Sequence, residues 1–216
     1  MDSDIVVDQT RAYLIYPLRE YLEDRGVDAF VSGNSFLYYD PDRPPVGPDL
    51  YVVLGGKWNG QKKWVSWEED GKLATTVMEF LSPSTEENDR GKKFLIYRDV
   101  FRAPEYFLID QDTLFIEGYQ YNKGHYLTMS PDADGWFDVP SLGLQLGPHD
   151  GWIRWRTAQG ALLPTMSEKA LFQSARAEQE KARAEQEKAR AESERERREA
   201  LEAKLRELGI DPDSIS

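Results

Sequence analysis

The stretch Thr75-Thr76-Val77-Met78-Glu79-Phe80-Leu81 decides the fold of this chain. It is short, almost wholly apolar and rich in residues that favour strands, which predicts a strand buried on both faces. The run Leu50-Tyr51-Val52-Val53-Leu54, which ends at Gly55-Gly56, has the same character. We therefore expect these two segments to be central strands of one sheet, because only central strands are apolar on both faces.

Helical patterns flank these strands. Residues 7–23 have apolar side chains at helical spacing, and Ser84 with Glu87 has the spacing of a capping box that opens a helix through about Arg98. Further extended segments are predicted at residues 29–39, 63–68, 105–110, 113–121 with 124–129, 142–146 and 152–156. Strands that alternate with helices, followed by a run of strands, predict an α/β (α+β) fold with a mixed central sheet flanked by helices.

The composition divides the chain near residue 160, because the aromatic residues fall almost entirely before this point. We expect a globular domain over residues 1–160 and a charged helical tail over residues 161–216. The heptad Ala-Arg-Ala-Glu-Gln-Glu-Lys at residues 175–181 recurs at 182–188 and, with substitutions, at 189–195. This repeat strongly favours a helix with Arg–Glu pairs at i,i+4 spacing.

The seam of these heptads consists of Ala and Gln rather than Leu and Ile, so it is poor for a coiled coil. We expect a solvated helix over residues 168–208 that is terminated by Gly209, with Pro212 beyond. Self-association, if it occurs, would use mainly Leu201, Leu205 and Leu208.

Composition also limits the chemistry. The 216 residues include no Cys and only two His, which excludes disulfides and thiolate sites and leaves few candidates for a Ser-His-Asp triad. An oxygen-ligated cation such as Mg2+ suits this composition better. Residues 1–10 lack signal-peptide features and no apolar stretch approaches a membrane span, so we expect a cytoplasmic protein without a membrane partner. The net charge of −12 argues against extensive phosphate binding.

Glu79 is the most informative residue, because an ionised carboxylate inside a buried strand is costly unless a cation, a metal or several donors meet it. Asp49 lies at the start of the other buried strand, and the alternative interpretation is that it is an ordinary turn residue. Together they form a suitable pair of oxygen ligands for Mg2+. Asp89, Lys93 and Tyr97 share one face of the following helix, so Lys93 could approach the same site. The alternatives are a structural ion pair for Glu79 and an Asp89/Lys93 pair at the surface.

These residues together resemble the Uma family, a group of restriction-endonuclease-like proteins long catalogued as a domain of unknown function. The resemblance covers most of residues 10–160 and rests on Pro48-Asp49, residues 79–85 beginning with Glu79, the Asp89-xxx-Lys93-xxx-Tyr97 spacing, and residues 104–110. The tail, which ends in Leu208-Gly209-Ile210-Asp211-Pro212, is also similar to tails in that family.

The resemblance implies a PD-(D/E)XK nuclease fold in which Asp49 and Glu79 are the motif acids. The Lys that usually follows the second acid by two residues is absent, since Leu81 occupies its position, and the helix Lys of the family matches Lys93. Family members also carry an acidic residue near the start of the first helix, for which only Asp4 or Asp8 could substitute here.

We therefore expect a restriction-type endonuclease that hydrolyses DNA with Mg2+ or Mn2+. Asp49 and Glu79 would bind the metal, and Lys93 would act on the phosphate. The DNA contacts would come from nearby basic side chains: Lys57, Lys62, Lys63, Arg90 and Lys92. Two other classes stay open. A catalytically inactive interaction protein would act through its tail, and a β-rich module for carbohydrate or small molecules would use Trp64, Trp67, Trp152 and Trp155.

Overall fold

The computed structural model describes residues 3–207, and the chain divides into two compact units, Met1–Met166 and Ser167–Ser216. No helix within residues 3–207 is both long and apolar enough to span a membrane.

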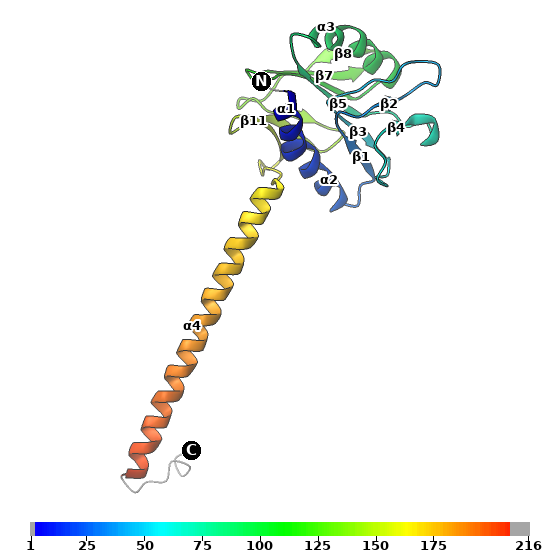
Figure 1. Ribbon diagram of the computed structural model, residues 1–216. Helices are drawn as coiled ribbons and strands as arrows, with labels where there is room; N and C mark the ends of the chain where they lie inside the picture. Colours follow the sequence, from blue (N-terminus) through cyan, green and yellow to red (C-terminus); the bar gives the residue numbers. More distant parts are fainter. Residues whose placement is uncertain (1–2, 208–216) are drawn as a thin grey trace. The chain divides into compact units, whose positions relative to one another are not determined.

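A mixed sheet forms the centre of the first unit (Figure 1). Among the described residues it has six strands, in the spatial order β1 (Ala29–Ser32), β3 (Leu50–Leu54), β5 (Thr76–Leu81), β6 (Glu105–Asp110), β7 (Ile116–Asn122) and β8 (His125–Thr128). Neighbouring strands are antiparallel except for the parallel pair β5–β6. The two apolar runs of the sequence are β3 and β5, inside the sheet, so the predicted mixed α/β fold is confirmed.

One face of the sheet packs against the N-terminal helices and a second sheet. The helices are α1 (Ser3–Gln9), η1 (Thr10–Ile15) and α2 (Tyr16–Glu23), and the second sheet contains β9 (Phe137–Val139), β10 (Leu144–His149) and β11 (Trp152–Thr157). Met78 and Phe80 of β5 point into this core. The indole Nε1 of Trp155 donates a hydrogen bond of 3.1 Å to the carbonyl of Leu14, which ties β11 to the helices.

The other face is covered by the helix that connects β5 to β6. A parallel pair of strands needs such a crossover connection, and here it consists of α3 (Glu86–Asn88), η3 (Asp89–Lys93) and η4 (Ile96–Phe101). We call residues 86–101 the crossover helix. A short parallel pair, β2 (Leu37–Tyr38) and β4 (Trp64–Val65), contributes to the same core, followed by η2 (Ser66–Glu68).

Several local predictions were wrong. The predicted strand at residues 63–68 is a strand only at β4 and continues as a short 3-10 helix, and the predicted extended segment at 29–39 divides into β1 and β2. The crossover helix begins after Thr85 without a side-chain cap. The hydroxyl of Ser84 instead contacts Ser82 at 3.0 Å, so the predicted capping box does not form.

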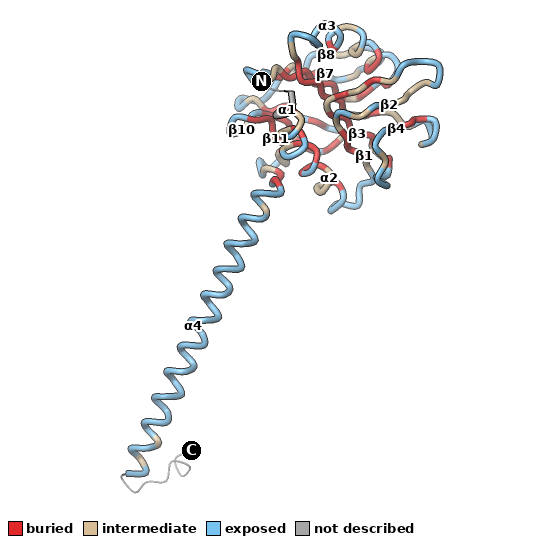
Figure 2. The backbone as a smooth tube through the Cα atoms, viewed as in Figure 1, coloured by how far each residue is buried: buried red, intermediate tan, exposed pale blue. Residues whose placement is uncertain are grey.

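The second unit contains the long helix α4 (Met166–Glu207), which confirms the predicted helical tail over the described residues. None of its residues is buried, and Figure 2 shows it in the exposed colour along almost its whole length. Arg–Glu pairs at i,i+4 spacing follow the helix, for example Arg176–Glu180 at 3.1 Å and Arg183–Glu187 at 3.2 Å. The predictions for Leu208, Gly209 and Pro212 concern positions outside the described residues.

Candidate active site

The two predicted acids lie opposite each other, with Glu79 in β5 and Asp49 directly before β3. Leu50 pairs with Met78 in the antiparallel pair β3–β5, so one further step of this register places Asp49 opposite Glu79. Residues directly opposite on one face of such a pair have Cβ atoms about 5 Å apart. Because side chains alternate along a strand, Glu79 points away from the core that contains Met78 and toward the crossover helix. The sheet register thus brings together two carboxylates that are 30 positions apart in sequence.

Glu79 is completely buried, and both of its carboxylate oxygens have donors. Oε2 lies 2.9 Å from Nζ of Lys93 and 3.4 Å from the backbone nitrogen of Asp49. Oε1 accepts a hydrogen bond of 2.7 Å from the hydroxyl of Tyr97. These contacts hold the carboxylate in one orientation and offset part of the cost of its burial.

Asp49 is half-buried and is fixed by the strand that carries Glu79. Its Oδ2 accepts a hydrogen bond of 2.7 Å from the backbone N–H of Phe80, the residue after Glu79. Burial raises the pKa of Asp49, while the Phe80 N–H and the Lys93 ammonium oppose this change. Asp49 as a residue is partly exposed to solvent, whereas Glu79 on β5 is completely buried.

The crossover helix supplies an ammonium group and a third carboxylate. Nζ of Lys93 lies 2.9 Å from Oδ1 of Asp89, the same distance as from Oε2 of Glu79, and 3.4 Å from the carbonyl oxygen of Gly47. The Asp89 contact is an ion pair without hydrogen-bond alignment. Asp89 is only 1% exposed, so the alternative of an Asp89/Lys93 pair at the surface is wrong.

Burial has the largest effect on the pKa values of this cluster. Burial, together with the charges of Asp49 and Asp89, raises the pKa of Glu79 to about 8, although Lys93 acts in the opposite direction. Burial lowers the pKa of Lys93, but the carboxylates of Glu79 and Asp89 outweigh it, and the pKa rises. Burial also raises the pKa of Tyr97, so this hydroxyl keeps its proton and donates. The Lys93 ammonium thus pairs with two carboxylates, and Asp49 adds a third acidic group to the cluster, so a further cation would relieve the excess negative charge.

The donor set fits a hard divalent cation bound through few protein ligands. Within residues 3–207, no group of three or more His, Cys, Asp or Glu side chains is arranged to hold a metal ion. Asp49 and Glu79 are the candidate ligands, because their side chains lie at opposite positions of the sheet register. Mg2+ is commonly bound in this way, because it keeps several of its waters and needs only one or two carboxylates from the protein.

The substitutes for the family's N-terminal acid, and the predicted DNA contact Arg90, are less favourably placed. Asp8, one substitute for the family's N-terminal acid, has a side chain that is 80% exposed and pairs with Arg11 at 3.7 Å. The side chain of Asp4 lies outside the described part of the structure. Arg90 donates to Glu117 at 2.9 Å and to Glu86 at 2.7 Å, so its charge is already compensated.

Three of the four Trp residues on which the carbohydrate-binding alternative rests are buried. Trp64, Trp152 and Trp155 are core residues with at most 3% exposure, and only Trp67 is exposed.

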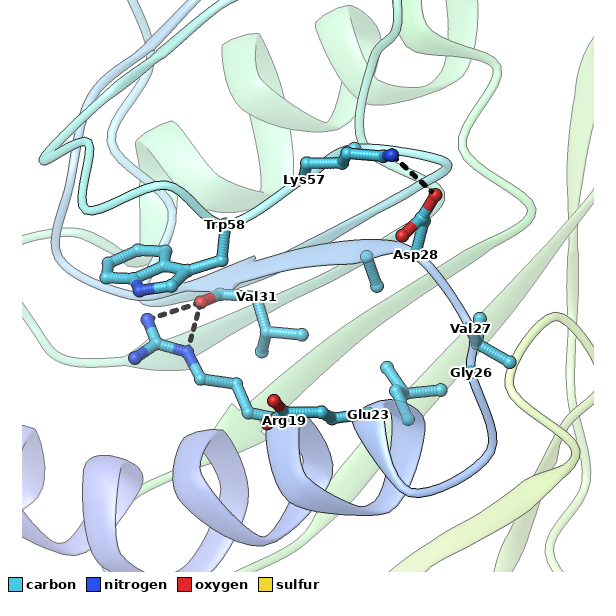
Figure 3. Close-up of a pocket in the computed structure, with 11 residues that line it drawn as sticks. Arg19, Glu23, Gly26, Val27, Asp28, Val31, Lys57 and Trp58 are labelled. Atoms are coloured by element: carbon cyan, nitrogen blue, oxygen red, sulfur yellow. Dashed lines mark hydrogen bonds and ion pairs between the residues drawn. The ribbon is translucent and has the colours of Figure 1, made fainter.

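A separate pocket of about 330 Å³ is formed by α2, the start of β1 and the loop after β3 (Figure 3). There the guanidinium of Arg19 lies 4.2 Å from the ring centroid of Trp58 and donates to the carbonyl of Val31. Lys57, a predicted DNA contact, pairs with Asp28 in this pocket at 3.5 Å. None of the three predicted site residues lines it.

The i, i+4, i+8 spacing predicted that Asp89, Lys93 and Tyr97 share one helix face. It did not predict that the Tyr97 hydroxyl donates to Glu79 or that the Gly47 carbonyl lies near Lys93. No sequence pattern could predict the contact of the Gly47 carbonyl, because every residue has a backbone carbonyl group.

Comparisons with known proteins identify the family of this chain. An uncharacterised protein from Synechocystis sp. is 36% identical over 69 residues, a match that spans 32% of this chain and 36% of that protein. A crystal structure from Anabaena variabilis, described as "a putative nuclease belonging to DUF820", is similar at a TM-score of 0.45 and 13% identity, covering 64% of this chain and 72% of that one.

A family model described as "Putative restriction endonuclease" matches residues 7–149, about two thirds of the chain. The matched range contains Asp49, Glu79, Asp89, Lys93 and Tyr97. The chain therefore belongs to the Uma2 family.

Proposed function

We propose that this protein is a metal-dependent endonuclease that hydrolyses phosphodiester bonds in DNA, with Asp49 and Glu79 as ligands of Mg2+ or Mn2+ and Lys93 as the catalytic cation. One observation carries this proposal: two carboxylates from neighbouring strands and an ammonium from the crossover helix meet in one buried cluster. Membership of the Uma2 family supports nuclease chemistry in general terms.

Each side chain of the cluster has a separate role in the proposed reaction. When bound, a divalent ion would supply a water of lowered pKa and neutralise phosphate charge. Asp49 and Glu79 would hold it, while the Tyr97 hydroxyl keeps the Glu79 carboxylate oriented. Lys93, whose side chain is 15% exposed, can present an N–H to a phosphate oxygen and stabilise the negative charge that develops there.

A metal titration combined with a nicking assay tests the proposal. Mg2+ or Mn2+ should bind the wild type and support nicking of supercoiled plasmid DNA, and Glu79→Gln should abolish both. The matched control is Glu105→Gln, because Glu105 is also a buried glutamate, 1% exposed, on the adjacent strand β6, and contacts Ser141 and Thr76 instead of the site. Cleavage that persists in Glu79→Gln would overturn the proposal.

The charge distribution favours a second candidate, a nuclease-fold protein without catalysis that acts through its tail. Residues 1–165 contain 26 acidic and 16 basic side chains, a net charge of −10, which repels DNA. Residues 166–207 contain 11 of each, so the exposed helix is neutral overall and offers regular charge pairs to a partner protein. A wild type that binds neither Mg2+ nor DNA would favour this candidate.

A further inference from the structure

An exposed aromatic ring lies beside the candidate active site. Phe36 is 57% exposed, whereas its neighbour Leu37 is completely buried. The backbone around Phe36 is fixed, because its carbonyl accepts a hydrogen bond of 3.0 Å from the N–H of Trp64, and Leu37 exchanges two backbone hydrogen bonds with Val46 at 2.8 and 3.1 Å. The ring is therefore held by rigid backbone while much of its surface faces solvent.

Only one residue separates this ring from the buried cluster. A Cβ atom added to Gly47 would lie 3.7 Å from Cδ1 and Cε1 of Phe36. The carbonyl of the same Gly47 lies 3.4 Å from Nζ of Lys93, which pairs with Glu79. The N–H of Asn34 also donates to the carbonyl of Pro48 at 3.1 Å, so the segment before Phe36 is tied to the segment that leads into Asp49.

A second ring and a cation extend the surface. The ring of Tyr38 lies 6.3 Å from that of Phe36, centroid to centroid, at an interplanar angle of 68°. Nζ of Lys63 lies 4.9 Å from the Tyr38 centroid, a cation–π distance. Parallel pairing of Tyr38 with Val65 keeps β2 beside β4, which Lys63 precedes. We call Phe36, Tyr38 and Lys63 the aromatic platform.

The net negative charge of the domain limits how strongly it can attract the phosphate backbone of a nucleic acid. With a net charge of −10 over residues 1–165, attraction of the phosphate backbone cannot supply much affinity, and Arg90 is already paired with Glu86 and Glu117. Stacking on an aromatic ring binds nucleic acid without this charge and with little sequence preference. It requires a base with a free face, which a stacked duplex does not offer.

Single exposed aromatic side chains are common and need no function by themselves. The rigid backbone, the single-residue distance from Lys93 and the cation at the rim distinguish Phe36. We propose that the aromatic platform stacks an unpaired base next to the phosphate held at the active site, so that the enzyme takes single-stranded DNA in preference to duplex. This inference rests on the proposed nuclease function.

Binding by fluorescence anisotropy tests the inference in the full-length protein. The probes are a labelled single-stranded oligonucleotide and the same strand annealed to its complement. The wild type should bind the single strand more tightly, and the dependence of this binding on salt should be shallow. Phe36→Ala should weaken single-strand binding about 5- to 150-fold, since stacking of one base contributes a factor of this size. Phe36→Trp should retain it.

The matched control is Phe172→Ala in α4, where Phe172 is 72% exposed but belongs to the other unit. Mg2+ binding by Phe36→Ala, followed calorimetrically, should equal that of the wild type, because a phenyl ring offers no ligand to the cation. If Phe36→Ala binds the single strand as well as the wild type does, or if the wild type prefers duplex, the inference is wrong even when metal-dependent cleavage is found. If Phe36→Ala loses single-strand binding but the wild type neither binds metal nor cleaves DNA, the aromatic platform is supported and the proposed nuclease function is rejected.

Discussion

The Nζ atom of Lys93 lies 2.9 Å from Oε2 of Glu79, inside a cluster where the glutamate is completely buried. Such a pair is not by itself evidence of stability, since desolvation of both charges can cancel their attraction. Removal of one partner is a different matter, because the other charge then stays buried without compensation. The pair therefore makes a clear prediction for the metal-free protein.

Lys93→Met should destabilise the metal-free protein by about 3–5 kcal/mol at pH 9, because the buried Glu79 carboxylate then either stays charged without its cation or has to take up a proton. Urea denaturation measures this change. The double variant Glu79→Gln/Lys93→Met should recover much of the loss, because it removes both charges. Losses that simply add in the double variant would mean that the two side chains are not energetically coupled.

The central strands could be predicted from the sequence because their apolar composition indicates that they are buried. Residues 50–54 are apolar and residues 76–81 are almost wholly apolar, with Glu79 as the charged exception, and this pattern can be recognised without knowing the partner strands. The strand β4 could not be predicted at its true length, since only the pairing of Leu37 with Trp64 and of Tyr38 with Val65 defines its two residues.

The residues of the candidate site could be predicted from the sequence, but the contacts between them could not. Asp49 and Glu79 were identifiable because acids at buried strands are unusual, but their opposition depends on the β3–β5 register, a long-range property. The burial of Asp89 is likewise decided by where the crossover helix lies on the sheet. A surface pair and a buried pair have the same i,i+4 spacing in sequence.

Stability of the metal-free protein should fall as the pH rises from about 4.5 to about 8. The folded state raises the pKa of Glu79 to about 8 from its ordinary value, so in this window it binds more protons than the unfolded state does. The contribution is present below the unfolded pKa and is lost as the pH rises, with a limiting slope of about 1.4 kcal/mol per pH unit.

Denaturation midpoints across this pH range check the sign, and Glu79→Gln serves as the reference because it cannot titrate. The difference between wild type and variant isolates Glu79 from other groups. If that difference does not change with pH, Glu79 does not have a raised pKa in the folded state.

Tyr97→Phe should weaken Mg2+ or Mn2+ binding by about 10- to 100-fold, because it removes the hydroxyl that donates to Oε1 of Glu79 at 2.7 Å and leaves the ring in place. Isothermal titration calorimetry provides the affinity. Tyr106→Phe is the control, since this buried hydroxyl donates to the backbone carbonyl of Asp89 at 3.0 Å and to neither proposed ligand. Equal effects of the two variants would indicate general loosening of the core rather than orientation of the carboxylate.

Deletion of residues 167–216 should leave the melting temperature of the remaining domain within about 2 °C of the full chain, since a loss of 1 kcal/mol would shift it by more than this. The reason is that no described residue of α4 is buried, and the apolar side chains Leu171 and Leu201 are 70% and 60% exposed. The helix is stabilised locally instead, by pairs such as Arg190–Glu194 at 3.0 Å. Differential scanning calorimetry at two protein concentrations makes the measurement. A large decrease at both concentrations would show that the tail stabilises the domain of its own chain. A decrease that grows with concentration would show that the full chain gains stability by pairing with a second copy through its tail.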